Sequence, residues 1–134
     1  MKTLIKSTFI TVCFLAISFT ILAQQANLTI ENNSRRTMTV KIMKGTGKGL
    51  LNNTVTIGAN NKEIIYFSET GYYFTKTKAI LNGREPVYQK GLPFKVINDD
   101  TGYSEMTLSF TIIESAVPKV TGGKQITKTE FDQN

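Results

Sequence analysis

Hydrophobic and polar residues alternate with a period of two along most of this chain. The alternation is clearest in residues 28–30, 38–42, 55–57 and 106–112, where apolar residues stand between Thr, Ser and Lys. Successive side chains of a β-strand point to opposite faces of the sheet, so this pattern is typical of strands that bury one face and expose the other. We therefore expect a chain of strands with no helices between them.

Two segments depart from this alternation. Residues Ile64 to Phe67 are apolar at every position, which predicts a central strand covered on both faces. Between residues 72 and 81 the apolar positions change parity, because Phe74 belongs to one face and Ala79 to the other. One extra residue in a strand reverses which side chains face the core, so we expect a β-bulge at residues 75–77.

Clusters of Gly, Asn, Asp and Ser predict turns at residues 32–34, 45–49, 58–61, 82–83 and 98–102. The Asn82-Gly83 pair suits a tight hairpin. Strands at this spacing predict an all-β fold, a single antiparallel β-sandwich of about seven strands. It would be immunoglobulin-like only in the loose sense, because there is no Cys-Trp-Cys pattern. The expected core residues are Ile30, Val40, Ile42, Ile57, Ile65, Phe67, Phe74, Phe94, Val96, Leu108, Phe110 and Ile112.

The first 23 residues have the parts of a secretory signal peptide. Lys2 and Lys6 precede an apolar run from Phe9 to Leu22, and Ala23 comes before a polar Gln pair. We expect cleavage after Ala23 and bacterial export, to the periplasm or to the outside of the cell. No later apolar stretch approaches the roughly 18 residues that span a bilayer, so we expect no stable membrane insertion after cleavage.

The remaining chain divides into a β-sandwich domain at residues 24–114 and a polar C-terminal tail at residues 115–134. The alternation stops in the tail, which contains Pro118 and a Gly pair, so we expect it to be loosely ordered. The alternative is one short helical turn, in which Thr127 is the cap, Glu130 completes a capping box and Phe131 is held by the turn.

Composition removes several kinds of chemistry. Cys13 is the only cysteine and lies in the signal segment, and the chain has no His and no Trp. The exported part therefore lacks a disulfide and the usual ligands of zinc, copper and haem, so we expect no cofactor and no metal. Two of the 16 basic residues lie in the signal segment, which leaves 14 against 10 acidic residues, a net charge of +4. This excess is dispersed along the chain and does not indicate a nucleic-acid partner.

Two short motifs resemble ligand sites but fit turns better. The run from Gly45 to Gly49 resembles a phosphate-binding loop, but Lys48 is followed by Gly where that loop needs Ser or Thr. We expect a flexible hairpin loop there. The Asp99-Asp100 pair could offer oxygens to a cation, but Asp before Thr101-Gly102 favours an Asx-type turn.

Catalysis in this chain would have to rest on carboxylates. A glycosidase can work with two of them, but one needs a raised pKa, from burial or from a like-charged neighbour. The sequence places no two acidic residues across a pocket, and no Ser-x-x-Lys spacing follows the signal segment. We therefore expect that the protein is not an enzyme.

Tyrosines and one stiff segment are the remaining candidates for a binding surface. Tyrosine rings can anchor a protein interface or stack on a sugar. Residues 82–94 place charged and aromatic side chains between Pro86 and Pro93, which favours either a binding surface or an edge strand guarded against aggregation. The candidate binding residues are Tyr72, Tyr73, Arg84, Glu85, Tyr88, Lys90 and Tyr103.

These observations favour a non-catalytic exported module that binds or supports an extracytoplasmic protein or surface component. Two alternatives remain open: a small carbohydrate-binding module, and a carboxylate-based hydrolase. The partner would be a protein or a glycan, and the sequence does not determine the oligomeric state.

Overall fold

The structure is a computed structural model, and it describes residues 25–134. The predicted signal peptide, with Cys13, lies outside the described residues. The described part consists mostly of strands, so the all-β prediction is confirmed. The elements are β1 (Asn27–Asn32), β2 (Thr37–Lys44), β3 (Leu50–Ile57), β4 (Lys62–Tyr66), β5 (Gly71–Ile80), β6 (Val87–Gly91), β7 (Phe94–Val96), β8 (Asn98–Asp99), β9 (Gly102–Tyr103), β10 (Glu105–Phe110), β11 (Ile112–Ile113), β12 (Lys119–Val120), β13 (Gly123–Gln125) and α2 (Lys128–Asp132).

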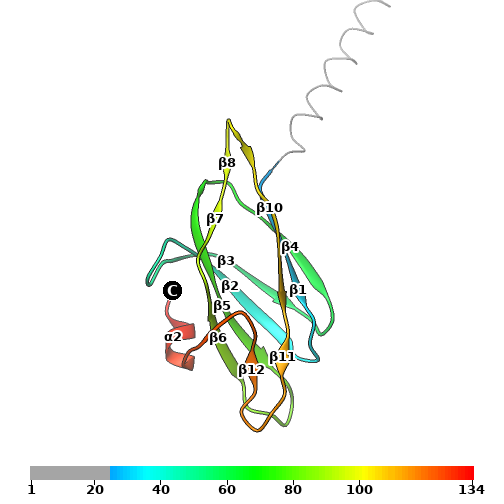
Figure 1. The fold of residues 1–134 in the computed structure, drawn as a ribbon. Coiled ribbons are helices and arrows are strands. Elements are labelled where there is room, and N and C mark those ends of the chain that lie inside the picture. The colour runs from blue at the N-terminus through cyan, green and yellow to red at the C-terminus, as the bar shows by residue number, and fades with distance from the viewer. Residues whose placement is uncertain (1–24) are drawn as a thin grey trace, which may run out of the picture.

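Two larger sheets make up the body of the molecule (Figure 1). One has three strands in the order β10-β1-β4, and β1 pairs with β10 in parallel. The other has six strands in the order β13-β6-β5-β2-β3, with β7 also paired to β5, and all its pairs are antiparallel. Two short ladders, β8–β9 and β11–β12, complete the pairing. The thirteen strands of residues 25–134 exceed the predicted number of about seven, because the tail and the segment around residue 100 add short ladders that carry no alternation.

Buried side chains from both larger sheets form one apolar cluster. Leu28 and Ile65 come from the three-stranded sheet, and Met38, Val40 and Ala79 from the six-stranded sheet. Most predicted core residues belong to this cluster or pack against it. Phe74 is the exception: it is buried, but on the opposite face of β5, away from the cluster.

The parity change in β5 has a different cause from the predicted bulge. The pairing of β5 with β2 runs without a register shift from Tyr73 to Ile80, so the strand is regular. Both of its faces are covered, since Thr75 and Thr77 are buried on one side and Phe74 and Lys76 on the other. In a strand that is covered on both faces, even- and odd-numbered side chains are both buried without a bulge.

The irregularity of the six-stranded sheet lies outside β5, and one further expectation, a central strand at residues 64–67, is wrong. The register shift in the six-stranded sheet lies between Ile42 and Met43, where Asn52 of β3 is the additional residue. The β4 strand lies at the edge of its sheet, and Ile64 and Tyr66 expose 52% and 57% of their surface. Its continuous apolar run therefore does not mark a central strand.

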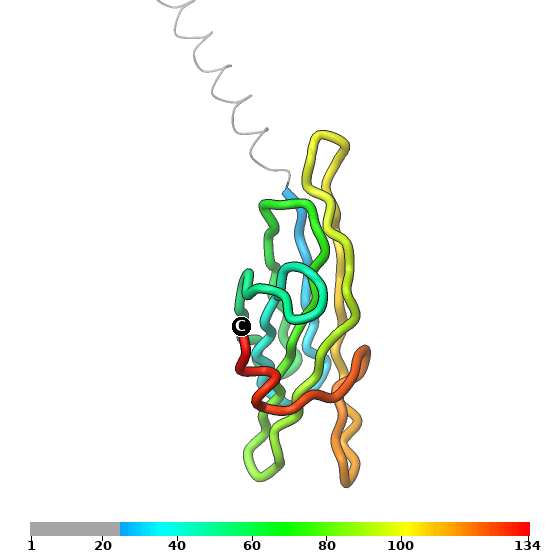
Figure 2. The backbone as a smooth tube through the Cα atoms, turned by 90° about the vertical axis from the view of Figure 1, so that its left-hand side faces the viewer, coloured from blue at the N-terminus to red at the C-terminus, as the bar shows by residue number. Residues whose placement is uncertain are grey.

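Residues 115–134 belong to the folded molecule, so the expectation of a loosely ordered tail is wrong. The segment forms β12, β13 and α2, and β13 pairs with β6. The alternative of a short helical turn is confirmed: Thr127 Oγ1 accepts from the Glu130 backbone N–H, and Phe131 is buried. Figure 2 shows the tail crossing the outside of the six-stranded sheet, next to the β2–β3 loop. Burial of Phe131 explains why so polar a segment docks.

The predicted turns are present. The glycine-rich run joins β2 to β3 as a hairpin loop, and Thr101 donates its backbone N–H to Asp99 Oδ1 at 2.8 Å in the expected Asx turn. The Asn82-Gly83 turn lies in a wider loop, because pairing of β5 with β6 begins only at Ala79 and Val87. Among residues 25–134 there is no helix long and apolar enough to cross a bilayer.

Candidate functional site

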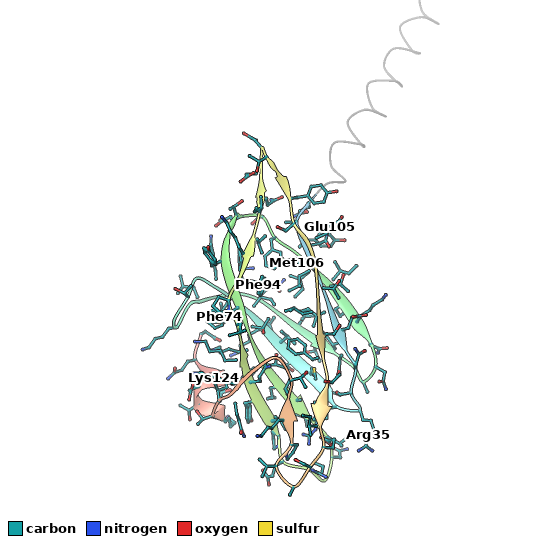
Figure 3. The ribbon with its side chains drawn as sticks, viewed as in Figure 1. Arg35, Phe74, Phe94, Glu105, Met106 and Lys124 are labelled. Carbon is teal, nitrogen blue, oxygen red and sulfur yellow. The ribbon has the colours of Figure 1, made fainter. Side chains whose placement is uncertain are left out.

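Four lysine side chains lie opposite one another across four adjacent strands. We call them the lysine row: Lys41 on β2, Lys76 on β5, Lys90 on β6 and Lys124 on β13. Directly opposed residues of antiparallel strands project from the same face. The row therefore crosses the outer face of the six-stranded sheet, the face opposite the apolar cluster. In Figure 3, Lys124 and Phe74 are labelled on the side of the sheet where α2 is drawn.

This arrangement costs stability, because like charges directly opposed in a sheet repel one another. The cost falls most heavily on Lys76, which is in the middle of the row and is only 5% exposed. Burial lowers the pKa of Lys76, and the charges of Lys41 and Lys90 lower it further. Asp132 and Glu130 act in the opposite direction, with smaller effects.

Neutral oxygen atoms accept most of the hydrogen bonds of the row. Lys76 Nζ donates to the main-chain oxygens of Glu130 (2.9 Å) and Gln133. Lys41 Nζ donates to the main-chain oxygen of Phe131 at 2.8 Å and to Asn134 Oδ1 at 2.7 Å.

On the other side of Lys76, Lys90 Nζ donates to the main-chain oxygen of Gly47 at 2.8 Å. None of the four lysines forms an ion pair within residues 25–134, where the ion pairs are Arg36–Glu114, Lys44–Glu69 and Lys128–Asp132. The positive charge of the row is therefore solvated by amide oxygens and not neutralised by a carboxylate.

The ring of Phe131 fixes α2 over the row. It is only 3% exposed and lies 5.6 Å from the Tyr88 ring, centroid to centroid. The Nζ atoms of Lys41 and Lys78 lie over it at 4.6 Å and 5.8 Å from the centroid. Tyr88, Lys41 and Lys78 therefore surround the Phe131 ring, and we call these three residues the aromatic cup. Two ammonium groups at its rim favour an aromatic occupant, because cations are attracted to the face of a π system.

Two hollows follow the row. The first, of about 600 Å³, lies between the β2–β3 loop and the tail, and its lining includes Lys48, Lys76, Lys90, Phe74 and Gln133. The second, of about 510 Å³, continues to the far end of the row and is lined by Lys90, Gly91, Leu92, Pro93, Gly123 and Lys124.

The β2–β3 loop comes close to the floor of the first hollow at Gly49. This residue has φ +62°, and a Cβ there would lie 2.7 Å from Phe74 Cε1. A side chain at this position would collide with the Phe74 ring, so glycine keeps the loop against the hollow.

The structure brings three of the seven predicted binding residues to this face. Tyr88 lies under Phe131, Lys90 belongs to the row, and Tyr72 is further along β5 on the same side, with 53% of its surface exposed. These three residues therefore share the outer face of the six-stranded sheet with the row.

The other four predicted residues lie elsewhere. Tyr73 is only 1% exposed: its ring packs 4.7 Å from that of Phe67 and its hydroxyl donates to the Glu69 main-chain oxygen, so it is a core residue and not a surface anchor. Arg84 and Glu85 are in the β5–β6 loop, where Arg84 donates to the Ser115 oxygen at 2.8 Å. Tyr103 is in the β8–β9 hairpin at the opposite end of the molecule (Figures 1 and 2).

Sequence reasoning missed Lys41, Lys76 and Lys124. In the sequence each has the pattern of an ordinary solvent-facing lysine on a strand, and only the pairing register aligns them. The one local signal is the Lys76–Lys78 repeat, which has the same parity as the buried Phe74.

The acidic residues do not form a comparable site. Within the described range, no three Asp or Glu residues gather as metal ligands would. Two hollows contain a pair of acids, Glu85 with Glu114 and Glu31 with Glu63. Glu114 is paired with Arg36 at 2.9 Å, and Glu31 accepts from the Ser109 hydroxyl at 2.6 Å.

Comparisons with protein-family models, with curated proteins and with solved structures found no match to this chain.

Proposed function

We propose that this protein is an exported, non-catalytic β-sandwich module that binds an acidic extracytoplasmic component through the lysine row. One observation carries the proposal: four opposed lysines cross the outer face of the six-stranded sheet without a carboxylate partner in the described chain. A sheet that needed only stability would place neutral or opposite charges at these positions. An anionic ligand relieves the repulsion, so the arrangement favours binding.

The proposal of a non-catalytic role is supported by the exposure of the carboxylates. Every Asp and Glu from residue 25 onward is exposed or half-buried. A carboxylic acid that serves as a general acid at neutral pH needs burial or a like-charged neighbour to raise its pKa. The carboxylate-based hydrolase is therefore the least supported of the three functions.

Export is supported by the sequence of the leader, with Lys2 and Lys6 before an apolar run and Ala23 before a polar pair. The sandwich proposal is supported by the apolar cluster, which draws on both larger sheets. Both features are compatible with a partner in the periplasm or outside the cell.

A second candidate is an acidic glycan, because Tyr72 and Tyr88 share the face of the row and tyrosine rings can stack on sugars. The present occupant of the face favours a polypeptide instead. The tail places an aromatic side chain in the cup and main-chain oxygens on two lysines. A protein segment with acidic side chains would use the same contacts.

The test is binding of fluorescent poly-L-glutamate, followed by anisotropy at low and moderate ionic strength. The exposed substitution Lys124→Ala and the substitution Lys90→Ala should each weaken binding about two- to five-fold, the usual range for one exposed ion pair. Binding should also weaken as salt rises, because screening reaches exposed charges first.

The matched controls are Lys62→Ala on β4 and Arg35→Ala before β2, each of which removes one positive charge from an exposed position away from the outer face of the six-stranded sheet. They should leave binding nearly unchanged. Equal losses from all four variants would overturn the proposal. Binding to polygalacturonate but not to poly-L-glutamate would select the glycan candidate.

A further inference from the structure

The tail already occupies the surface on which the acidic ligand would bind. Residues 127–134, which we call the cover, supply the Glu130, Phe131 and Gln133 main-chain oxygens that solvate Lys41 and Lys76. They also form one wall of the 600 Å³ hollow. An acidic segment could take over these hydrogen bonds of Lys41 and Lys76 only if the cover moved away.

We propose that the cover is an internal competitor, and that an acidic polypeptide segment displaces it from Lys41, Lys76 and the aromatic cup. The inference rests on the proposed function, and it assigns the ligand class and the regulation of that same site. The cover acts as an intramolecular pseudo-ligand: it accepts the hydrogen bonds of Lys41 and Lys76 until an acidic segment replaces it.

The difference between the two acceptors drives the exchange. The cover accepts the hydrogen bonds of Lys41 and Lys76 with amide oxygens, and its Asp132 and Glu130 carboxylates act on Lys76 only through space, whereas an acidic segment offers carboxylates directly to the same ammonium groups. Hydrogen bonds in which both donor and acceptor are ionised are shorter and stronger than those to a neutral acceptor. The gain is greatest at Lys76, because Lys41 and Lys90 lie directly opposite it on the two neighbouring strands and add two further positive charges.

The cover is also lightly held. Its helix α2 has five residues, and an isolated helix of that length is not stable in water. Phe131 is its one buried side chain, while Thr127, Lys128, Thr129 and Glu130 are exposed. The preceding segment is fixed independently, since β13 pairs with β6 and the Ile126 N–H donates to the Tyr88 oxygen at 3.1 Å. The cover can therefore detach while the sheet stays intact.

The predicted consequence is higher affinity when the cover is loosened. A site that is open for a fraction of the time has its apparent affinity reduced by that fraction. The substitution Phe131→Ala removes the anchor and leaves every lysine in place, so poly-L-glutamate should bind more tightly, by about ten-fold if the cover is closed roughly nine-tenths of the time. Tyr66→Ala, which removes an exposed aromatic ring from the outer face of the other sheet, is the matched control and should not change affinity.

A direct reporter is available because the chain has no tryptophan. In a Phe131→Trp variant the indole would be the only one, and its emission should shift to longer wavelength when poly-L-glutamate displaces the cover. A Tyr66→Trp variant, whose indole is already in water, should show no shift. If Phe131→Trp fails to fold, protection of the Phe131 amide from hydrogen exchange, with and without poly-L-glutamate, reports the same event.

The outcomes separate the two proposals. Binding that is equal in the unaltered protein and in Phe131→Ala, with no movement of the reporter, overturns the cover and leaves the proposed function intact. Absence of binding in both proteins overturns the proposed function itself. Tighter binding by Phe131→Ala, together with the emission shift, supports both.

Discussion

At the scale of single residues, Arg36 is the largest side chain that residues 25–134 bury completely. Its Nε donates to Glu114 Oε1 at 2.9 Å, and its Nη1 donates to the main-chain oxygens of Glu85 at 2.9 Å and Ala79 at 3.3 Å. One guanidinium thus joins the start of β2 to the β5–β6 loop and to the segment after β11. The sequence did not indicate this role, because Arg35 and Arg36 are chemically identical neighbours after a turn.

Removing this side chain should destabilise the protein. The substitution Arg36→Met should lower the free energy of unfolding by about 2–3 kcal/mol, at or below the low end for broken buried pairs because the Glu114 side chain is partly exposed and stays hydrated. The substitution Arg35→Met removes an exposed guanidinium and should cost less than about 0.5 kcal/mol. Urea denaturation measures both. Equal changes in the free energy of unfolding for the two variants would show that the buried contacts of Arg36 do not stabilise the protein.

Tyr73 gives the protein a pH dependence on the alkaline side. Burial raises the pKa of its phenol above the ordinary value of 10.0. Above pH 10 the unfolded chain therefore loses this proton more readily than the folded chain, so the free energy of unfolding falls as pH rises through that region. Below pH 10 the contribution of the protonated phenol is fully present.

The substitution Tyr73→Phe should cost about 1 kcal/mol at neutral pH, where it removes the hydrogen bond to the Glu69 oxygen. It should also reduce the loss of stability between pH 10 and 11. Denaturation curves at pH 7, 10 and 11 test this prediction, with Tyr72→Phe as the exposed control. An unchanged alkaline slope in Tyr73→Phe would assign the pH dependence to other groups.

At the scale of elements, β5 shows where sequence patterns reach their limit. Alternation identified strands because most of them have one wet face, as in β1 and β10. It failed for β5, whose outer face is covered by the tail, and for β4, which is apolar on both parities yet lies at an edge. A covered face and an exposed apolar face give the same pattern, and only the tertiary neighbours distinguish them.

The helix α2 depends on its N-cap residue, Thr127. Thr127 Oγ1 accepts from the Glu130 N–H at 3.1 Å, and Phe131 N–H donates to the Thr127 oxygen at 3.0 Å. Loss of an N-cap hydroxyl costs a helix about 1 kcal/mol. The substitution Thr127→Ala should therefore speed hydrogen exchange of the Phe131 amide about five-fold and leave the unfolding midpoint of the sheets nearly unchanged.

The exposed Thr129, two residues further along the chain and within α2, provides the comparison. Its side chain accepts no capping bond, so Thr129→Ala should leave exchange at Phe131 the same or slightly slower, because alanine has the higher helix propensity. Faster exchange from both variants would indicate a general loosening of the tail instead of a lost cap.

At the scale of the whole molecule, the lysine row is a property of the register and of no single segment. Its members come from positions 41, 76, 90 and 124, and a shift of one residue in any pairing would turn a lysine to the other face. The all-β class, the turns and most of the core followed from local patterns. The site did not, because no local pattern records which strands become neighbours.

The six-stranded sheet ends on one side in β3, whose eight residues contain no charge and no proline. Leu50 and Leu51 are 72% and 41% exposed on this strand. Long uncharged edge strands are sites of unwanted pairing between chains. The substitution Asn52→Lys, at the bulge, should slow aggregation on heating as followed by light scattering. Asn52→Gln keeps the strand neutral and should aggregate like the unaltered protein.

The pairing of β1 constrains the order in which the molecule can be completed. Asn27 lies beside Tyr66 on one side and beside Glu105 on the other, so the first strand is the middle member of its sheet. The chain is synthesised from its amino end, so β1 is made long before its parallel partner β10. The paired residues Asn27 and Glu105 are 78 positions apart in the sequence. Until β10 is made, the amide and carbonyl groups on that flank of β1 have no permanent neighbour. Maturation of this domain should therefore be a late event, slow for a chain of this size and vulnerable to capture by chaperones while it waits.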